Sequence, residues 1–203
     1  MITPKTARSA RKQQQMVASA SELFMTKGYA ETSMDDVAKH AQVSKQTVYA
    51  HFGSKNELFC VCIERKCTEV MVPLPTLPDS VDLRPQLMAF CMQISDVMQS
   101  AEATYVHRLC VSQGATHPQL AHVFYQYGPQ QLCQRLTQFL EQLALRPQWQ
   151  IPNPALAAEQ LFMLLKGMDG IRRQLGITQE TQQARQQRIA QALELFCRGY
   201  WAA

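Results

Sequence analysis

The chain has 203 residues, enough for one or two domains with a hydrophobic core. Hydrophobic residues make up 46% of it and charged residues 18%, which excludes an intrinsically disordered chain. No apolar run reaches about 18 residues and the first residues are too polar for a signal peptide, so we expect a cytoplasmic protein that does not enter a membrane.

The net charge of +4 is concentrated toward the N-terminus. Lys5, Arg8, Arg11 and Lys12 fall within residues 1–15, with no Asp or Glu among them. A basic arm of this kind is typical of proteins that bind a polyanion. A frayed, solvated terminus explains the same pattern, so the arm alone does not decide the function.

Apolar residues recur at helical spacing along almost the whole chain. No stretch alternates convincingly with period two, so the sequence predicts an all-α fold. The clearest stripes are Val17, Ala20 and Phe24; Met34, Val37, Ala38 and Ala41; Leu83, Leu87, Phe90, Ile94 and Val97; and Leu132, Leu136, Phe139 and Leu143.

Local motifs mark the starts of several helices. Ser33 and Ser54 each precede an acidic residue by three positions, Asp36 and Glu57, which is a capping pattern. Asn153 stands immediately before a proline, as expected for an N-cap followed by the first helical turn. These motifs predict helices beginning close to residues 34, 55 and 154.

A proline-rich stretch, VPLPTLPD at residues 72–79, interrupts the helical pattern. Pro73, Pro75 and Pro78 cannot continue a helix and favour extended geometry in the residues before them. We place a domain boundary there, between an N-terminal domain at 1–71 and a larger helical domain at 80–203.

Residues 33–52 have the pattern of a helix-turn-helix. The second helix, which Ser44 begins, carries only a narrow apolar stripe of Val48 and Phe52. Lys45, Gln46, Thr47 and Tyr49 point elsewhere, and all four carry hydrogen-bonding groups. Such a helix fits the major groove of DNA, with Lys45, Gln46 and Thr47 at the base edges.

Further donors near this helix predict contacts to the phosphate backbone. Free backbone amides at the start of the next helix also favour an anion there. The residues assigned to the backbone contacts are Thr32, Ser33, Tyr49, His51 and Lys55, and Ser44 completes the predicted interface. Short capped helices with an aromatic pair occur in many folds, so spacing alone leaves a purely structural role open.

The run ASELFMTKGYAETSMDDVAKHAQVSKQTVYAHFGSKNELF resembles the DNA-binding domain of the TetR family of bacterial transcription repressors. The resemblance covers about residues 10–65 and implies a three-helix head with a helix-turn-helix. The chain departs from the family at Gln42, where glycine is common in the turn. A left-handed backbone at Gln42 would cost roughly 1 kcal/mol. The features that match are Leu23-Phe24, Gly28-Tyr29, Thr32-Ser33, Val37-Ala38, Ala41, Val43-Ser44, Thr47, Tyr49, His51-Phe52, Lys55 and Leu58.

The C-terminal half is similar, less specifically, to AefR-like regulators of the same family, over RLCVSQGATHPQLAHVFYQYGP and ALAAEQLFMLLKGMDGIRRQLG. The resemblance implies a ligand-binding domain that dimerises through its last two long helices. Two heads are also needed physically, because one short helix reads few base pairs. The expected dimer residues are Leu161, Leu164, Leu165, Met168, Ile189, Leu193, Phe196 and Tyr200, although the same stripes could pack inside one subunit.

The implied effector is an unknown small molecule, largely apolar, which binds one conformation of the dimer better than the other. Methionine and aromatic side chains suit such a ligand, although each is also ordinary core material. The candidate lining residues are Phe90, Ile94, Met98, Tyr105, Phe124, Tyr127, Phe162, Met163 and Lys166.

Seven cysteines without an export signal indicate free thiols in a reducing compartment. Cys60 and Cys67 share a helix face, which leaves a thiol redox switch as an alternative, and no metal or cofactor site is predicted. Neither a phosphate-binding loop nor a hydrolase or metalloprotease motif is present, so we expect no enzyme. The predicted function is a ligand-responsive, dimeric DNA-binding repressor of a palindromic operator; a helical adaptor is the remaining alternative.

Overall fold

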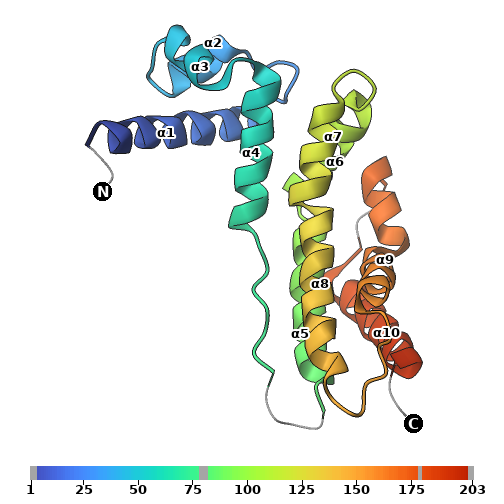
Figure 1. Cartoon of the computed structure of the whole chain (residues 1–203). Helices are drawn as coiled ribbons and strands as arrows, with labels where there is room; N and C mark the ends of the chain where they lie inside the picture. The colour runs from blue at the N-terminus through green and yellow to red at the C-terminus, as the bar shows by residue number, and fades with distance from the viewer. Residues whose placement is uncertain (1–3, 78–81, 178–179, 201–203) are drawn as a thin grey trace. The chain divides into compact units, whose positions relative to one another are not determined.

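The computed structural model describes residues 4–77, 82–177 and 180–200, and for residues 4–8 only the backbone. The Lys5 and Arg8 side chains of the basic arm, and Pro78 of the predicted break, lie outside this part. Regular secondary structure in the described residues is α-helical throughout, which confirms the all-α prediction (Figure 1). The helices are α1 (Pro4–Thr26), α2 (Met34–His40), α3 (Lys45–Phe52), α4 (Lys55–Glu69), α5 (Arg84–Met98), α6 (Ala101–Gln113), α7 (Pro118–Tyr127), α8 (Pro129–Ala144), α9 (Pro154–Leu175) and α10 (Gln182–Tyr200).

The chain forms two compact units. The first comprises Met1–Glu69 and also Cys110–Phe124, and the second comprises Val70–Leu109 and Tyr125–Ala203. The first boundary between the two units falls between Glu69 and Val70, close to the proline-rich stretch at residues 72–79. The allocation of 110–124 to the first unit was not foreseen, because it depends on tertiary contacts of α6 and α7.

The core of the first unit forms where α1 packs on α4. Met16 and Phe24 of α1 and Leu58 and Phe59 of α4 are buried. The rings of Phe24 and Phe59 meet edge to face with their centroids 5.0 Å apart, a favoured aromatic geometry. The short helices α2 and α3 pack on each other. In addition, α2 packs on α1 and α3 packs on α4.

Two of the predicted caps hold the helices of this unit in place. Ser33 and Asp36 form a complete capping box at the start of α2. The Glu57 backbone N–H donates to Ser54 Oγ at 3.2 Å at the start of α4. The third predicted cap, Asn153, accepts a hydrogen bond from the Leu156 N–H at 3.0 Å in the second unit. All three predicted helix starts are therefore confirmed.

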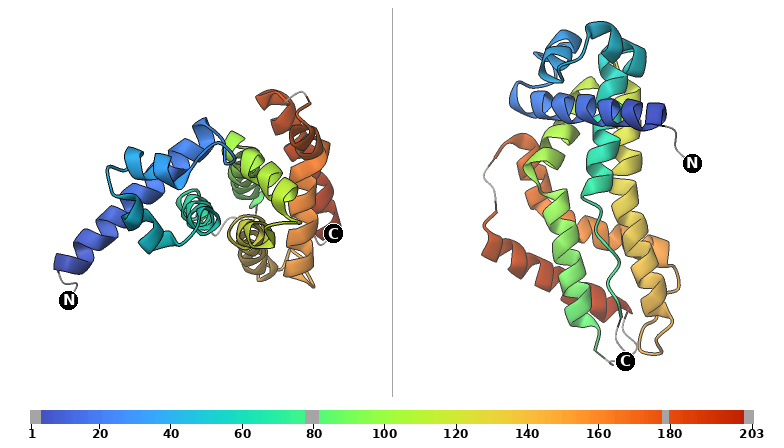
Figure 2. Two further views of the ribbon diagram at one scale, coloured as in Figure 1. Left: turned by 90° about the horizontal axis from the view of Figure 1, so that it is seen from above. Right: turned by 90° about the vertical axis from the view of Figure 1, so that its left-hand side faces the viewer.

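The core of the second unit is built from α5, α8, α9 and α10 (Figure 2). The Phe90 ring of α5 lies with its centroid 4.9 Å from that of Phe139 on α8. α9 packs on both α8 and α10. Among the described helices, none combines the length and apolar character needed to cross a lipid bilayer.

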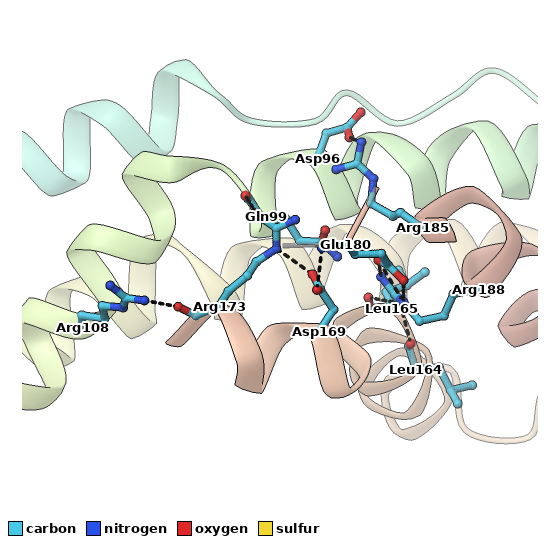
Figure 3. Close-up of polar contacts among 10 residues, drawn as sticks. All are labelled: Asp96, Gln99, Arg108, Leu164, Leu165, Asp169, Arg173, Glu180, Arg185 and Arg188. Carbon is cyan, nitrogen blue, oxygen red and sulfur yellow. Dashed lines mark hydrogen bonds and ion pairs between the residues drawn. The ribbon is translucent and has the colours of Figure 1, made fainter. Parts of the chain in front are cut away.

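α9 is broken at Gly167, which has φ 53° and ψ −170°. This backbone region is open essentially only to glycine. The Arg188 side chain of α10 lies at the break, where its Nη1 donates to the Leu165 carbonyl at 2.8 Å (Figure 3). Its Nη2 also pairs with Glu180 Oε2 at 2.9 Å. The helical spacing of Leu161, Leu164, Leu165 and Met168 in the sequence gives no sign of this break.

Candidate nucleic-acid interface

Small apolar side chains fix α2 and α3 against each other. Val37, Ala38 and Ala41 come from α2 and its C-cap, and Val48 and Phe52 come from α3; none is more than 5% exposed. The narrow apolar stripe predicted for α3 is therefore its packing face. The other side chains of this helix are exposed, apart from the half-buried Thr47.

The turn between the two helices contains a residue with positive φ, Gln42, at φ 52°. The left-handed conformation considered at this position is thus confirmed. The Val43 N–H donates to the Ala38 carbonyl at 3.0 Å, and Gln15 Nε2 of α1 donates to the Ala41 carbonyl at 3.0 Å. Sequence reasoning missed Gln15, because its partner lies far along the chain and leaves no local signal.

Ser44 caps α3 and Thr47 is bound to that cap. The Thr47 N–H donates to Ser44 Oγ at 3.1 Å, and the two hydroxyl oxygens lie 2.8 Å apart. Since both hydroxyls take part in the cap, their first contribution is to fix the start of α3. The cap therefore fixes the first turn of α3, which carries Lys45 and Gln46.

Four of the predicted contact residues are exposed on α3: Lys45, Gln46, Tyr49 and His51. Tyr49 is 43% exposed, so that its ring and hydroxyl are open to a partner. All four carry hydrogen-bonding groups, so they form a surface suited to a polyanion with donors and acceptors along a groove.

Lys45 pairs with a carboxylate that the sequence reading did not single out. Asp35 of α2 holds its ammonium in an ion pair, and the Lys45 Nζ lies 5.8 Å from the centre of the Tyr49 ring. The hydrogen bond from Lys45 to Asp35 raises the pKa of the lysine above its ordinary value. The only sequence signal for Asp35 was its place in the first turn of α2, which is common for acids anyway.

Two predicted phosphate contacts have hydroxyls that are already engaged inside the head. Thr32 is 1% exposed and donates to the Gly28 carbonyl at 2.8 Å. Ser33 Oγ accepts from the Asp36 N–H at 3.1 Å and donates to the Asp36 carboxylate at 2.8 Å. The Ser33 backbone N–H, which donates to the Asp36 carboxylate at 3.0 Å, and the Ser33 hydroxyl together hold the pKa of Asp36 below its usual value. The expectation for the Thr32 side chain is therefore wrong, and the Ser33 hydroxyl acts first as a helix cap.

Lys55 is also engaged within the head. Its Nζ donates to the Tyr29 carbonyl at 3.0 Å and to the Ala30 carbonyl at 3.4 Å. The same atom lies 4.5 Å from the centre of the Tyr29 ring, within cation–π range. Lys55 ties the start of α4 to the segment after α1, which revises its expected role as a free phosphate ligand.

The expected effector residues differ in how deeply they are buried. Phe90 and Ile94 are fully buried core, Met98 and Phe162 pack at the edge of that core, and Met163 is 61% exposed. Met163 therefore lies at the surface, apart from the buried Phe90 and Ile94.

The remaining effector candidates lie in both units. Phe124 belongs to the first unit, whereas Tyr105, Tyr127 and Lys166 belong to the second, where all three are half-buried. Burial lowers the pKa of the His107 imidazole, and the nearby positive charge of Lys166 lowers it further.

Most of the expected dimer residues are used inside their own subunit. Met168 is the exception at 61% exposed, and Leu164 and Tyr200 are half-buried. The side chains that lie in the subunit core are Leu161, Leu165, Ile189, Leu193 and Phe196. Their stripes pack one subunit, which is the alternative that the sequence left open.

The cysteines are free thiols, three of them buried and four partly buried. Burial raises the pKa of all seven, that of Cys62 to about 11 and that of Cys110 to about 12. Since the thiolate is the reactive form, these environments do not favour a redox sensor. Within the described residues, no group of His, Cys, Asp and Glu has the arrangement of a metal site.

Family models match both halves of the chain. Residues 17–60 match the bacterial regulatory proteins of the tetR family, and residues 85–202 match the C-terminal domain of AefR-like transcriptional repressors. Two solved structures are similar over nearly the whole chain. A TetR-family transcriptional regulator from Mesorhizobium loti is 26% identical with a TM-score of 0.88, covering 96% of this chain and 99% of that one. The flavonoid-responsive regulator FrrA is 32% identical with a TM-score of 0.79, covering 95% and 98%.

Curated relatives match over shorter stretches. The transcriptional activator FasR of Mycolicibacterium smegmatis is 31% identical over 53% of this chain, and the match spans 49% of FasR. The transcriptional repressor SCO4008 of Streptomyces coelicolor is 34% identical over 29% of this chain and 31% of its own length. With a helix-turn-helix head and a C-terminal domain that both match family models, this chain belongs to the TetR family of bacterial transcriptional regulators.

Proposed function

We propose that the chain binds a palindromic operator as a homodimer in the bacterial cytoplasm and represses transcription until a small molecule releases it. The observation that carries the DNA-binding part is the surface of α3, where Lys45, Gln46, Tyr49 and His51 are exposed around a buried Val48–Phe52 stripe. Regulators of this family bind operator DNA as dimers and respond to small-molecule effectors.

The chemistry of α3 supports reading of bases by its first turn. Gln46 can form two hydrogen bonds with adenine, and Lys45 can donate to guanine. Tyr49 and His51 would then meet the phosphates. Each good base contact discriminates by about 1–3 kcal/mol, so two heads on half-sites one helical turn apart, or a multiple of it, supply the specificity that one head lacks.

An exposed face of α9 and α10 supports the dimer. Leu156 and Met163, two turns apart on α9, are 49% and 61% exposed, and Leu195 of α10 is 63% exposed. These three side chains line a groove of about 690 Å³ whose wall includes Tyr200. We propose that a second copy of the chain covers this face, because apolar side chains at this spacing suit a bundle of four helices between subunits.

The direction of regulation and the effector class rest on similarity. The C-terminal domain matches that of AefR-like repressors, which favours repression, although one relative is an activator. FrrA, which is similar over nearly its whole length, is named as responsive to flavonoids. We therefore propose a planar aromatic effector with hydroxyl groups.

The decisive experiment for DNA binding is fluorescence anisotropy with the DNA upstream of the protein's own gene, across a salt series. A steep fall of log affinity with log salt is expected. Gln46→Ala should weaken operator binding about 10-fold and leave binding to scrambled DNA unchanged. Gln187→Ala, an exposed glutamine on α10, is the control. Binding that is absent at low salt, or unaffected by Gln46→Ala, would refute the assignment.

The dimer face is tested by light scattering after gel filtration. Leu195→Glu should shift the protein from dimer to monomer and abolish high-affinity operator binding. Leu145→Glu is the matched control, since Leu145 is an isolated leucine 83% exposed at the end of α8. A dimer that survives Leu195→Glu and Met163→Glu together would place the interface elsewhere.

A further inference from the structure

Two neutral polar side chains are buried at the C-terminal end of α5. Ser95 and Gln99 lie one helical turn apart, and they are 0% and 7% exposed. Within the described residues, neither the Ser95 hydroxyl oxygen nor the amide oxygen and nitrogen of the Gln99 side chain has a hydrogen-bond partner. The Gln99 backbone carbonyl, in contrast, accepts a bond from Arg173 Nη1 at 3.3 Å.

Burying these polar groups without hydrogen-bond partners is unfavourable for the stability of the fold. A serine inside a helix can donate to the carbonyl four residues earlier, as Thr137 of α8 does to the Cys133 carbonyl at 3.0 Å. A buried polar group without a partner costs about 1–3 kcal/mol, and such groups are rare in native structures unless something else meets them. Three unmet atoms on one face of α5 point to a binding role.

The charged groups nearby are already balanced, which narrows the chemistry of what could bind. Asp169, 2% exposed, accepts a hydrogen bond from Arg173 Nε at 2.6 Å and another from the Glu180 N–H at 3.1 Å (Figure 3). Asp96, near the same end of α5, pairs with Arg185 at 2.8 Å. The charges of this network therefore pair off, so that a neutral molecule fits it better than an added carboxylate or ammonium. Arg185 Nε is buried without a hydrogen-bond partner within the described residues and adds one open donor near the same end of α5.

The unmet groups themselves are one amide donor, one amide acceptor and one hydroxyl. An amide and a hydroxyl recognise a neutral hydroxyl, phenol or carboxamide, because each can give one hydrogen bond and accept another. Two apolar residues of α5 directly precede Ser95 and Gln99 in the chain: Ile94 is fully buried and Met98 packs at the core edge. A mostly apolar molecule with a hydroxyl at one end fits both features.

We propose that Ser95 and Gln99 form the polar end of the effector site and bind a hydroxyl group of an uncharged, largely apolar effector. The proposal rests on the proposed function in one respect, the existence of an effector. It adds two residues that the sequence reading did not select and the chemical group they recognise.

The first test needs no effector. In the full-length protein, Ser95→Ala and Gln99→Met should each raise the melting temperature by roughly 2–4 °C, because each removes a buried group without a partner. Gln93→Met, an exposed glutamine on the same helix, should leave it unchanged. If Ser95→Ala and Gln99→Met lower the melting temperature, the two groups have structural partners, such as a bound water, and the proposal fails.

The second test uses the matched pair 7-hydroxyflavone and flavone, which differ by one hydroxyl. Calorimetry should show that the wild type binds the hydroxylated compound at least 5-fold more tightly than flavone, roughly the value of one hydrogen bond. Gln99→Met should still bind flavone but should lose this preference. A preference that survives in Gln99→Met would show that the hydroxyl is recognised elsewhere.

The failures are distinguishable. If neither compound binds the wild type, the flavonoid-like effector class of the proposed function is wrong, and the melting temperatures still decide whether the Ser95 and Gln99 groups lack partners, on which the proposed site rests. If both compounds bind but operator DNA is not released, effector-controlled release is wrong while the site stands.

Discussion

Lys45, the first residue of α3, is bound to Asp35 of the preceding helix, with its Nζ 2.8 Å from one carboxylate oxygen and 3.1 Å from the other. Their side chains are 59% and 49% exposed, so water and salt weaken this pair and DNA can compete with it. The pair places a negative charge beside the surface that we propose for DNA, and it holds back a lysine that would otherwise be free.

Removing that charge should make the protein bind DNA more strongly and less selectively. Asp35→Asn frees Lys45 for phosphates, so affinity for scrambled DNA should rise several-fold and the salt slope should steepen by roughly 1. The ratio of operator to scrambled affinity should fall. Glu64→Gln, an exposed acid on α4, is the control in the same anisotropy experiment. If the ratio of operator to scrambled affinity rises in Asp35→Asn, the pair with Asp35 does not hold Lys45 back from non-specific phosphate contacts, and the prediction is wrong.

Lys55 should prove to stabilise the head more than it holds DNA. Lys55→Met removes its bonds to the Tyr29 and Ala30 carbonyls, and we expect a loss of about 1–2 kcal/mol in the free energy of unfolding. Urea denaturation measures this loss, and Lys39→Met, an exposed lysine on α2, should show none. If instead stability is kept and the salt slope falls by roughly 1, Lys55 is a phosphate ligand after all.

The turn at Gln42 carries strain that glycine would relieve. Gln42→Gly should raise the free energy of unfolding by up to about 1 kcal/mol, because a non-glycine residue at φ 52° is disfavoured. Gln42→Ala keeps the Cβ atom and should bring no gain. Urea denaturation of the three proteins is the measurement, and equal stabilities for the glycine and alanine variants would argue against strain.

The break in α9 should tolerate no side chain. Gly167→Ala places a Cβ 3.2 Å from Arg188 Nη1 and forces a residue with a side chain into a glycine-only region, so we expect a loss of about 1–3 kcal/mol. Arg188→Met should also destabilise, because it leaves Glu180 and the Leu165 carbonyl without this donor. Thermal unfolding checks both, and an unchanged melting temperature for Gly167→Ala would show that α9 can straighten at little cost.

Helix starts were predictable because a cap is a local interaction. Ser33, Ser44 and Asn153 each bind a backbone N–H three positions ahead, and their sequence neighbourhood contains both partners. The buried stripe of α3, Val48 and Phe52, followed from spacing for the same reason. The roles of Thr32 and Lys55 did not. Thr32 donates to the Gly28 and Leu23 carbonyls and Lys55 to the Tyr29 carbonyl, but in the sequence a hydroxyl or an ammonium looks the same whether it is free or bonded.

The sequence by itself determined the helices, their caps and the order of a short DNA-reading helix after a tight turn, since periodicity, capping and turn geometry act over a few neighbouring residues. Tertiary structure alone decided which side chains remain free: that Lys45 is paired, that Leu161 and Ile189 are core while Leu156 and Leu195 are exposed, and that Ser95 and Gln99 are buried without partners. Burial and pairing depend on contacts between distant segments, and no spacing along the chain encodes them.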